Sequence, residues 1–405
     1  MNVLYFHQHF STPSGSTGIR SYQMAQRLLK HRHQVTMVCG SYVGGETGLI
    51  TQFVKGRREG VVDGIYIIEF DLAYSNADGL IKRTGIFLTF ALKSIGIALT
   101  HKYDVVFATT TPLTAGIPGI FARWLRGKPF VFEVRDLWPE LPKEMGVIKN
   151  PLVLAAMSML EWCSYRSAYR CIGLSPGIVE GIKKCGLNTS KVEMIPNGCD
   201  LTIFSDCLTP WRPDGVEDTN LMAVFTGTHG VANGLDAALD AAVELKKRCR
   251  GDIKLVFVGQ GRLKEDLQTR AKLEGLDNVI FHPPVNKSKL ADLMKGADIG
   301  LQLLANIPAF YYGTSPNKFF DYISASLPVI NNYPGWLADM IKDNNCGYAI
   351  EPDNAEAFAN ALEHAADNRQ LLSEMGERAI TLAKRDFNRH DLADKWVAWV
   401  VGAKK

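Results

Sequence analysis

The chain has 405 residues, which suits two domains of roughly 180–200 residues, each with its own core. Charged residues make up 21% and hydrophobic residues 46%, and the formal net charge is +3 at pH 7. This composition is that of a soluble globular protein and gives no indication of a nucleic-acid partner. Eight scattered cysteines without a CxxC pair predict neither a zinc site nor a disulfide scaffold, and they fit a reducing cytoplasm.

The chain begins with "NVLYF", a strand-like run that lacks the basic and apolar regions of a signal peptide, so we expect no export. The following loop contains Gly15, Ser16, Thr17 and Gly18 and precedes a helical pattern. Glycines at a helix start let backbone amides approach a phosphate or a sugar, so these four residues are candidate substrate-binding residues. The loop lacks the full GxGxxG fingerprint, which disfavours NAD. GxxxxGK[ST] and GxSxG motifs are missing as well, which disfavours kinases, simple NTPases and serine hydrolases.

The longest apolar stretch covers residues 80–100, but three basic residues interrupt it, so we expect no transmembrane helix. On a helix, Lys82, Thr89, Lys93 and Thr100 would form one narrow polar stripe beside a broad apolar face. Such a helix either lies in a membrane interface, with its lysines near lipid headgroups, or is buried in the core of its own domain.

Short apolar runs alternate with amphipathic segments along both halves of the chain, which predicts parallel sheets covered by helices. In the first half, the runs predict strands at 3–6, 35–39, 65–70, 104–110, 130–134, 171–175 and 192–196. In the second half, they predict strands at 221–227, 253–261, 278–281, 297–304, 327–332 and 346–350.

The interval 205–220 is rich in Pro, Asp and Gly, lacks periodicity and is typical of a linker. We therefore expect an α/β protein with an N-terminal domain at 1–204 and a C-terminal domain at 221–385. A final amphipathic helix, at about 386–405, is expected to pack back on the first domain. Ligands of parallel sheets bind beyond the carboxyl ends of the strands, so the reactive site is expected in the cleft between the domains.

The stretch 314–330, "TSPNKFFDYISASLPVI", opens with helix-start signals. Ser315 suits the N-cap and Pro316 the first helical position. Lys318 would then lie in the first turn, with Asp321 three residues further on the same face. This arrangement favours an anion site beside a hydroxyl, and the alternative is an ordinary capped helix with a surface ion pair.

Seven segments together resemble family 4 glycosyltransferases of the GT-B fold, which build bacterial surface polysaccharides. These are "GSTGIRSYQMAQRLLKHRHQVTMV", "KPFVFEVRDLWPELP", "VEMIPNGCDLTIF", "FTGTHGVANGLDAALDAA", "LVFVGQGRLKEDL", "NVIFHPP" and "SPNKFFDYISASLPVI". Within the family the chain looks most like the WbuB-like subgroup, associated with transfer of N-acetyl-L-fucosamine or similar sugars. The resemblance covers essentially the entire chain and implies two Rossmann-like domains, the first for the acceptor and the second for a nucleotide sugar.

The resemblance implies roles for the residues around the predicted helix start. Asp321 would hold the ribose hydroxyls of a UDP-sugar, because a carboxylate accepts two O–H bonds. The helix start, with Ser315, Asn317 and Lys318, would neutralise the leaving diphosphate. The loop after the first strand of the second domain, which contains Gly227, would also contact the donor.

The chain departs from the family pattern in that loop and before the helix. Many relatives carry an additional acid where this chain has Gly313, and an Arg and a Lys where it has Thr228 and Asn233. Lys318 must therefore carry more of the charge that holds the diphosphate. His229 in the same loop either assists or is a surface residue.

A third departure lies in "VRDLWPE", where Arg135 replaces a histidine that contacts the donor sugar in many relatives. We expect Arg135 and the following Asp136 to face the cleft and to act in catalysis together with the lysine. Because that histidine contacts the 6-hydroxyl, its loss favours a 6-deoxy donor such as UDP-N-acetyl-L-fucosamine or UDP-N-acetylquinovosamine. The opposing interpretation is that Arg135 pairs with Asp136 or Glu140, and that Trp138 packs in the core at a strand-end turn.

The family implies transfer with retention of anomeric configuration, without a protein nucleophile, a metal or another cofactor. The lack of an Asp-x-Asp pair argues against the other major transferase fold. The expected acceptor is a saccharide linked to polyprenyl diphosphate, so the protein should bind peripherally to the inner face of the cell membrane from the cytoplasm. Two alternatives stay open: a UDP-sugar 2-epimerase, and a degenerate homologue that binds a nucleotide sugar without turnover.

Overall fold

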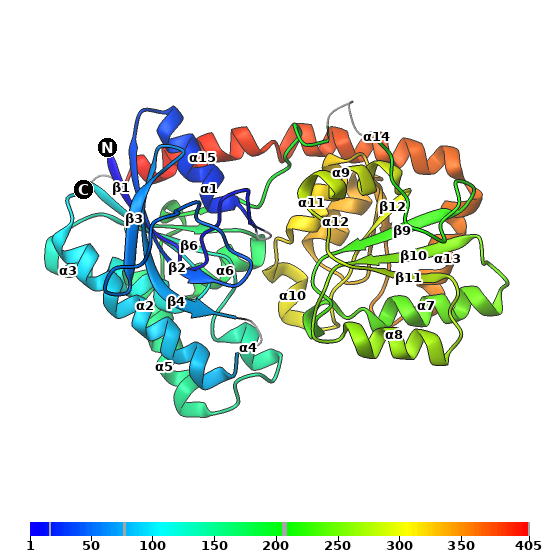
Figure 1. The fold of residues 1–405 in the computed structure, drawn as a ribbon, viewed down its shortest axis with the longest axis horizontal. Helices are drawn as coiled ribbons and strands as arrows, with labels where there is room; N and C mark the ends of the chain where they lie inside the picture. The colour runs from blue at the N-terminus through cyan, green and yellow to red at the C-terminus, as the bar shows by residue number, and fades with distance from the viewer. Residues whose placement is uncertain (16–17, 76–77, 205–208, 404–405) are drawn as a thin grey trace. The chain divides into compact units, whose positions relative to one another are not determined.

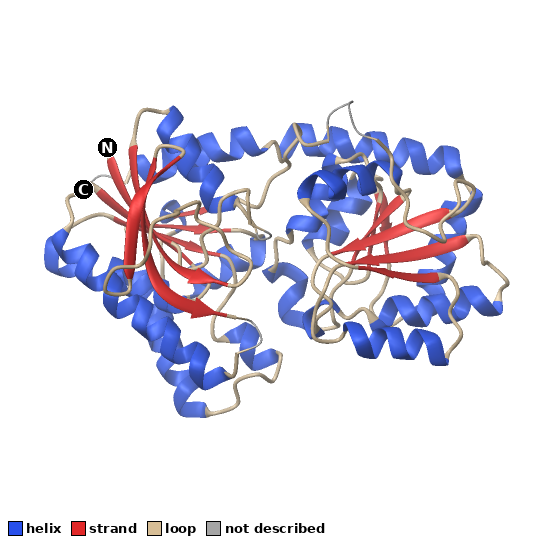
Figure 2. Cartoon of the chain, in the orientation of Figure 1, coloured by secondary structure: helices blue, strands red, loops and turns tan. Residues whose placement is uncertain are grey.

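The structure of the protein is a computed structural model that describes residues 1–15, 18–75, 78–204 and 209–403 (Figure 1). The chain divides into two compact units. Unit 1 comprises Met1–Pro196, Gly313–Ser315 and His390–Lys405, and unit 2 comprises Asn197–Tyr312 and Pro316–Arg389. Figure 2 shows helices on both faces of a sheet in each unit, which is the arrangement that the alternation of runs predicts.

Unit 1 is built on an eight-stranded sheet with the order β3-β4-β2-β1-β5-β6-β7-β8, in which only β3 is antiparallel to its neighbour. Its strands are β1 (Asn2–Phe6), β2 (Gln34–Tyr42), β3 (Arg57–Val62), β4 (Ile65–Tyr74), β5 (Val105–Thr109), β6 (Phe130–Val134), β7 (Arg170–Gly173) and β8 (Val192–Met194). Its helices are α1 (Arg20–Lys30), α2 (Leu80–Thr100), α3 (Ile117–Arg126), α4 (Glu140–Glu144), α5 (Pro151–Ser167), α6 (Pro176–Lys184) and α15 (Arg389–Val401).

The sequence pattern missed β3. This strand, "RREGVV", lies at the edge of the sheet with no fully buried residue, so it lacks the apolar run that marked the other strands. It pairs with β4 through the turn at Asp63 and Gly64, both of which have positive φ.

Unit 2 is built on a six-stranded, wholly parallel sheet with the order β11-β10-β9-β12-β13-β14. Its strands are β9 (Leu221–Thr226), β10 (Ile253–Val258), β11 (Val279–His282), β12 (Ile299–Gln302), β13 (Val329–Asn331) and β14 (Gly347–Ala349). Its helices are α7 (Asp236–Lys247), α8 (Lys264–Leu273), α9 (Lys287–Gly296), α10 (Pro308–Gly313), α11 (Asn317–Ser324), α12 (Trp336–Asp343), α13 (Ala355–Asp367) and α14 (Arg369–Asp386).

The end of the interval predicted to be a linker is part of unit 2. Arg212 forms an ion pair with Asp298 at 3.0 Å, and the backbone N–H of Trp211 donates to the Asp292 carbonyl. Residues 209–220 are therefore anchored on α9 and on the segment leading into β12. Residues 205–208 lie outside the described residues.

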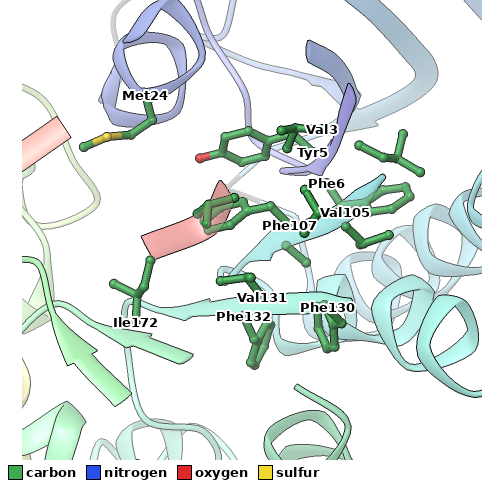
Figure 3. Packing of buried hydrophobic residues seen from close by; sticks show 14 of the residues in the cluster. Val3, Tyr5, Phe6, Met24, Val105, Phe107, Phe130, Val131, Phe132 and Ile172 are labelled. Carbon is green, nitrogen blue, oxygen red and sulfur yellow. The ribbon is translucent and has the colours of Figure 1, made fainter. Parts of the chain in front are cut away.

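The core of unit 1 is formed by large apolar side chains from its central strands (Figure 3). Tyr5 of β1 packs edge-on against Phe107 of β5, with ring centroids 4.5 Å apart. Trp396 of α15 completes this cluster, because its ring lies 4.7 Å from Phe107 and the side chain is fully buried. The C-terminal amphipathic pattern thus supplies a core residue to the N-terminal sheet, and it begins only at Arg389, after α14 has ended.

Candidate functional site

The loop after β9 in unit 2 brings a glycine against the lysine of α11. Gly227 has a φ of +138°, which favours glycine. A Cβ atom added there would lie 3.7 Å from Cε of Lys318, so the backbone and the side chain are neighbours without a clash. The contact between Gly227 and Lys318 follows from the parallel sheet, because loops that leave the carboxyl ends of parallel strands lie along the same edge of the sheet.

Lys318 lies in the first turn of α11, as predicted, and its ammonium is held by neutral groups. Nζ donates a 2.6 Å hydrogen bond to Oδ1 of Asn233, whose own amide donates to the Thr228 carbonyl at 2.7 Å. Nζ also lies 4.2 Å from the centroid of the Phe225 ring. Burial lowers the pKa of Lys318 from 10.5 to about 7. The site therefore contains an amine that an arriving anion would hold in its charged form.

The predicted capping of this helix is wrong by one residue. Pro316 has a ψ of 128°, which is extended, so it occupies the N-cap position and the helix begins at Asn317. Ser315 therefore precedes the N-cap position instead of occupying it, and the N-cap residue itself makes no side-chain capping hydrogen bond. Asn317 is exposed at the first helical position.

Asp321 lies one turn further along α11 but does not form an ion pair with Lys318. Burial raises the pKa of Asp321, while the charges of Arg389 and Lys287 oppose that shift. The surface ion pair considered from the sequence is thus absent between these two described residues. The two side chains of this short helix interact with different neighbours: Lys318 with Asn233, and Asp321 with the charges of Arg389 and Lys287.

His229 is completely buried, which contradicts the alternative that it is a surface residue. Its ring lies among Phe225, Phe257 and Phe281, with centroids 6.0–6.3 Å away. Neither ring nitrogen has a hydrogen-bond partner among the described residues. Burial, aided by the charges of two nearby lysines, lowers the pKa of His229 to about 4. At neutral pH the imidazole is uncharged, so it cannot supply the positive charge that the sequence allowed for.

In unit 1, Arg135 follows β6 and is held by polar groups of its own unit. Its Nε donates to Oγ1 of Thr109 at 2.8 Å and lies 3.3 Å from Oε1 of Glu133, and Nη2 donates to Oγ of Ser21 at 2.9 Å. The ion-pair partner is therefore Glu133, and neither of the two acids considered from the sequence. The side chain remains 21% exposed.

Asp136 accepts a 3.2 Å hydrogen bond from Oγ1 of Thr111. Burial raises its pKa, and the hydrogen bond and the Arg135 charge oppose that shift. Trp138 packs against the core of unit 1, in agreement with the structural alternative for "DLWP". Arg135 and Asp136 thus lie together at the carboxyl end of β6.

The glycine loop after β1 is only partly described. A Cβ atom at Gly15 would lie 2.2 Å from Oγ of Ser11 and 3.0 Å from the backbone N of Glu46, so close packing within unit 1 requires this glycine. Gly18 is exposed and directly precedes the N-cap of α1. Ser16 and Thr17 lie outside the described residues.

A buried ion pair that was not predicted from the sequence lies beside the predicted catalytic arginine, Arg135. Nη2 of Arg20 donates to Oε2 of Glu133 at 2.9 Å, and the guanidinium also donates to the carbonyls of Ile195 and Pro196. Glu133 is fully buried. The one indication of this in the sequence was that an acidic residue interrupts the apolar run "FVFEV".

Directly after β1, three polar residues form a second group that was not predicted from the sequence. His7 and Gln8 are buried, and His9 follows them in the chain. The signal was visible as "HQH", three consecutive polar residues after an apolar strand, at the same sheet edge as Arg135.

Two family matches cover most of the chain. Residues 15–198 match the family described as glycosyl transferase 4-like domain. Residues 211–382 match the family described as glycosyl transferases group 1. Each match falls almost entirely within one half of the chain, and both halves match glycosyltransferase families.

Similar proteins agree with these matches. D-inositol 3-phosphate glycosyltransferase of Arthrobacter sp. is 28% identical over 203 residues, which are 48% of this chain and 46% of that protein. O-antigen chain mannosyltransferase C of Escherichia coli is 25% identical over 233 residues, 56% of this chain and 58% of that protein. The chain spans about half the length of the curated relatives that it matches.

Solved structures share the fold over the full length of the chain. HepE of Anabaena in complex with UDP-glucose superposes with a TM-score of 0.67 at 14% identity and covers 100% of both chains. WaaG, a glycosyltransferase involved in lipopolysaccharide biosynthesis, superposes with a TM-score of 0.68 at 17% identity and covers 99% of this chain and 100% of its own. At 14–17% identity, the similarity of these structures to the chain establishes a shared fold of two α/β domains.

Proposed function

We propose that the chain is a glycosyltransferase that moves a sugar from a UDP-sugar to a lipid-linked saccharide, because its N-terminal half matches the 4-like family, its C-terminal half matches the group 1 family, and it shares the fold of WaaG. We further propose that the anomeric configuration is retained, as in family 4. The two family matches do not favour the 2-epimerase or the non-catalytic homologue.

The observation that carries the donor assignment is the contact between the loop after β9 and α11 in unit 2. An open glycine backbone at Gly227 lies beside the ammonium of Lys318, and this combination suits a diphosphate. The structures of HepE in complex with UDP and with UDP-glucose support uracil as the base of the donor nucleotide. Asp321, one turn along α11, would accept hydrogen bonds from the ribose hydroxyls.

In the proposed reaction the acceptor hydroxyl attacks the anomeric carbon on the face from which UDP departs. The bond from that carbon to the diphosphate oxygen breaks, and the acceptor proton passes to a phosphate oxygen of the leaving UDP. No protein nucleophile takes part. Lys318 would stabilise the charge that develops on the diphosphate, which is the kind of interaction that lowers a barrier most effectively in a partly buried site.

We propose an N-acetylated, 6-deoxy sugar as the donated group, with UDP-N-acetyl-L-fucosamine or UDP-N-acetylquinovosamine as candidates. The support is the WbuB-like resemblance and the absence of a histidine at position 135. In unit 1 the guanidinium of Arg135 donates hydrogen bonds to Glu133 and to Ser21. Neighbours from its own unit therefore already accept the hydrogen bonds of these guanidinium N–H groups.

We propose that unit 1 binds the inner face of the cell membrane, where a polyprenyl-diphosphate-linked acceptor would lie. The helix α2 is long and apolar enough to cross a membrane, yet less than a third of its most apolar window is buried. It packs against α3, which packs against α5. Exposed large apolar side chains on these three helices are Leu80, Ile81, Leu88, Leu92, Phe121, Trp124, Leu125, Leu152, Val153, Met159 and Trp162.

The charge of this surface fits anionic lipids. The helices α2 and α3 carry Lys82, Arg83, Lys93, Arg123 and Arg126 and no acidic residue. Exposed apolar residues flanked by basic ones suit an interface with headgroups, and the broader surface on α3 and α5 was not foreseen from the sequence.

A panel of nucleotide sugars tests the donor. A cognate donor at about 100 times its dissociation constant should stabilise the protein by about 2.7 kcal/mol, and the donors that stabilise should then be tested for transfer. Transfer from UDP-N-acetylglucosamine should be slower than from its 6-deoxy counterpart. The reverse preference would contradict the 6-deoxy assignment alone, and 2-epimer formation or binding without product would contradict the transferase proposal.

A further inference from the structure

Three consecutive polar residues at the carboxyl end of β1 each have a buried polar atom without a hydrogen-bond partner among the described residues, and two of them, His7 and Gln8, are buried as whole residues. His7 is 4% exposed and Gln8 is 1% exposed. Nδ1 of His7, both amide atoms of Gln8 and Nε2 of His9 have no hydrogen-bond partner among the residues that the structure describes. Buried polar groups are almost always paired in folded proteins, so a run of three with unpaired atoms needs a cause other than folding.

The surroundings of the run are aromatic. The ring of His9 lies 4.5 Å from that of Tyr74 and 5.2 Å from that of Tyr42, and Phe87 of α2 lies on it edge-on at 6.1 Å. Sugars are bound in proteins by hydrogen bonds to their hydroxyls combined with apolar contact to their C–H faces, and aromatic rings supply such contact.

The two histidines are uncharged at neutral pH. Burial, together with the charge of Arg135, lowers the pKa of His7 well below its usual value and that of His9 to about 4. A neutral imidazole has one donor and one acceptor, and the Gln8 amide has both as well. Such groups match hydroxyls, which donate and accept, better than they match a phosphate, which at neutral pH mainly accepts.

We propose that His7, Gln8 and His9 bind hydroxyl groups of the acceptor saccharide. The inference rests on the proposed transferase function and gives unit 1 a specific acceptor contact. The group lies at the same sheet edge as Arg135 and Asp136, and it touches Phe87 of α2, a helix that also carries part of the apolar surface proposed to meet the membrane. One helix would thus connect the lipid surface with the site that holds the acceptor's sugar.

The test compares wild type with Gln8→Leu and His7→Phe in the full-length chain, with Gln52→Leu, an exposed glutamine of unit 1, as the matched control. The probe acceptor is N-acetylglucosamine diphosphate on a short polyprenyl chain in detergent, paired with the donor that the nucleotide-sugar panel identifies. Four quantities are measured: the melting temperature, the Kd of UDP, the KM of the acceptor and direct acceptor binding by saturation-transfer NMR.

We expect each variant to raise the acceptor KM at least tenfold and to leave the Kd of UDP within about twofold. The melting temperature should be unchanged or higher, because the substitution removes unpaired buried polar atoms. An unchanged acceptor KM overturns the proposal. A lower melting temperature with parallel losses of UDP and acceptor binding also overturns it, because the residues would then be structural.

Failure of the proposed function gives a different result. If wild type neither transfers to the probe nor binds it, the acceptor class is wrong and this inference falls with it. If wild type transfers and Gln8→Leu transfers equally well, the transferase assignment stands and only the assignment of this site is wrong.

Discussion

Nζ of Lys318 donates a hydrogen bond to Oδ1 of Asn233, 85 positions earlier in the chain, and this bond places the lysine beside the loop that follows β9. Many relatives that the sequence resembles carry an Arg and a Lys in that loop, whereas this chain has Thr228 and Asn233. The amide therefore fixes the single ammonium of α11 beside the loop in which the resemblance implies two cations.

We expect Lys318→Ala to abolish most transfer while the protein stays folded. Removing the Lys318 side chain removes the cation proposed to stabilise the departing diphosphate. The barrier to transfer should therefore rise by about 2–4 kcal/mol, as for loss of one oxyanion donor. The kcat with saturating donor measures this. Lys295→Ala, which removes an exposed lysine of the same unit, is the control and should have wild-type kinetics. Wild-type kinetics in Lys318→Ala would refute the site.

Asp321→Ala should act mainly on donor binding. A carboxylate that accepts bonds from two ribose hydroxyls contributes to ground-state affinity, so the KM for the UDP-sugar should rise far more than kcat falls. The fold should be retained, because the core contacts of α11 come from Phe319, Phe320 and Ile323, all fully buried. Isothermal calorimetry with UDP and with uracil alone checks the assignment: a variant that loses affinity for both equally would place Asp321 away from the ribose.

UDP binding should depend on the titration of Lys318. Its pKa in the free protein is about 7, below the ordinary 10.5, so the neutral amine predominates above pH 7. A bound diphosphate favours the ammonium, and binding should then take up a proton. The affinity for UDP should fall by up to tenfold per pH unit between about pH 7.5 and 9, where UDP itself is fully ionised. Lys318→Met should bind UDP weakly with no such dependence, and a wild-type affinity that is flat over this range would contradict the prediction.

The same pKa shift affects the stability of the fold with the opposite sign. Between pH 7 and pH 10.5 the unfolded chain binds more protons at this lysine than the folded one, so the free energy of unfolding should rise with pH through that window. Urea unfolding of wild type and Lys318→Met at both ends of the window isolates this contribution.

Glu133→Gln should destabilise unit 1 by about 3–5 kcal/mol, because it leaves the Arg20 guanidinium buried without its charge partner. Burial alone would raise the pKa of Glu133, but the charges of Arg20 and Arg135 outweigh it and lower the pKa. The stabilisation is therefore present at neutral pH and is lost as the pH falls through the acid range. Urea unfolding should show the difference at pH 7. Glu180→Gln, which breaks the exposed pair with Lys183, should cost less than about 1 kcal/mol.

Vesicle binding should depend on the basic residues of α2. The double variant Lys82→Glu/Lys93→Glu should bind anionic vesicles more weakly than wild type, and wild-type binding should weaken at high salt. Lys247→Glu/Lys295→Glu makes the same charge change on exposed positions of unit 2 and should bind like wild type. Equal binding by the α2 variant in a vesicle sedimentation assay would show that another surface meets the lipid.

Local sequence patterns determined where most elements lie. Buried parallel strands are continuous apolar runs, so β6 was predicted at its observed bounds, and the long apolar pattern of α2 predicted the observed 80–100. The edge strand β3 was not predicted, because its residues are not fully buried and therefore do not form an apolar run in the sequence. The start of α11 was displaced by one residue because proline fits both the N-cap and the first helical position, and only its ψ decides between them.

Tertiary structure alone decided the pairings that make the site. Nothing local to Asn233 indicates that it holds Lys318, and nothing near Arg135 indicates that Thr109 and Ser21 bind it, because these contacts depend on which strands and helices become neighbours. The burial of His229, and with it the loss of its charge, likewise depends on aromatic side chains from three different strands, β9, β10 and β11. A sequence states which groups can donate, accept or carry charge, and the packing of the sheet decides which of them meet and how much water they keep.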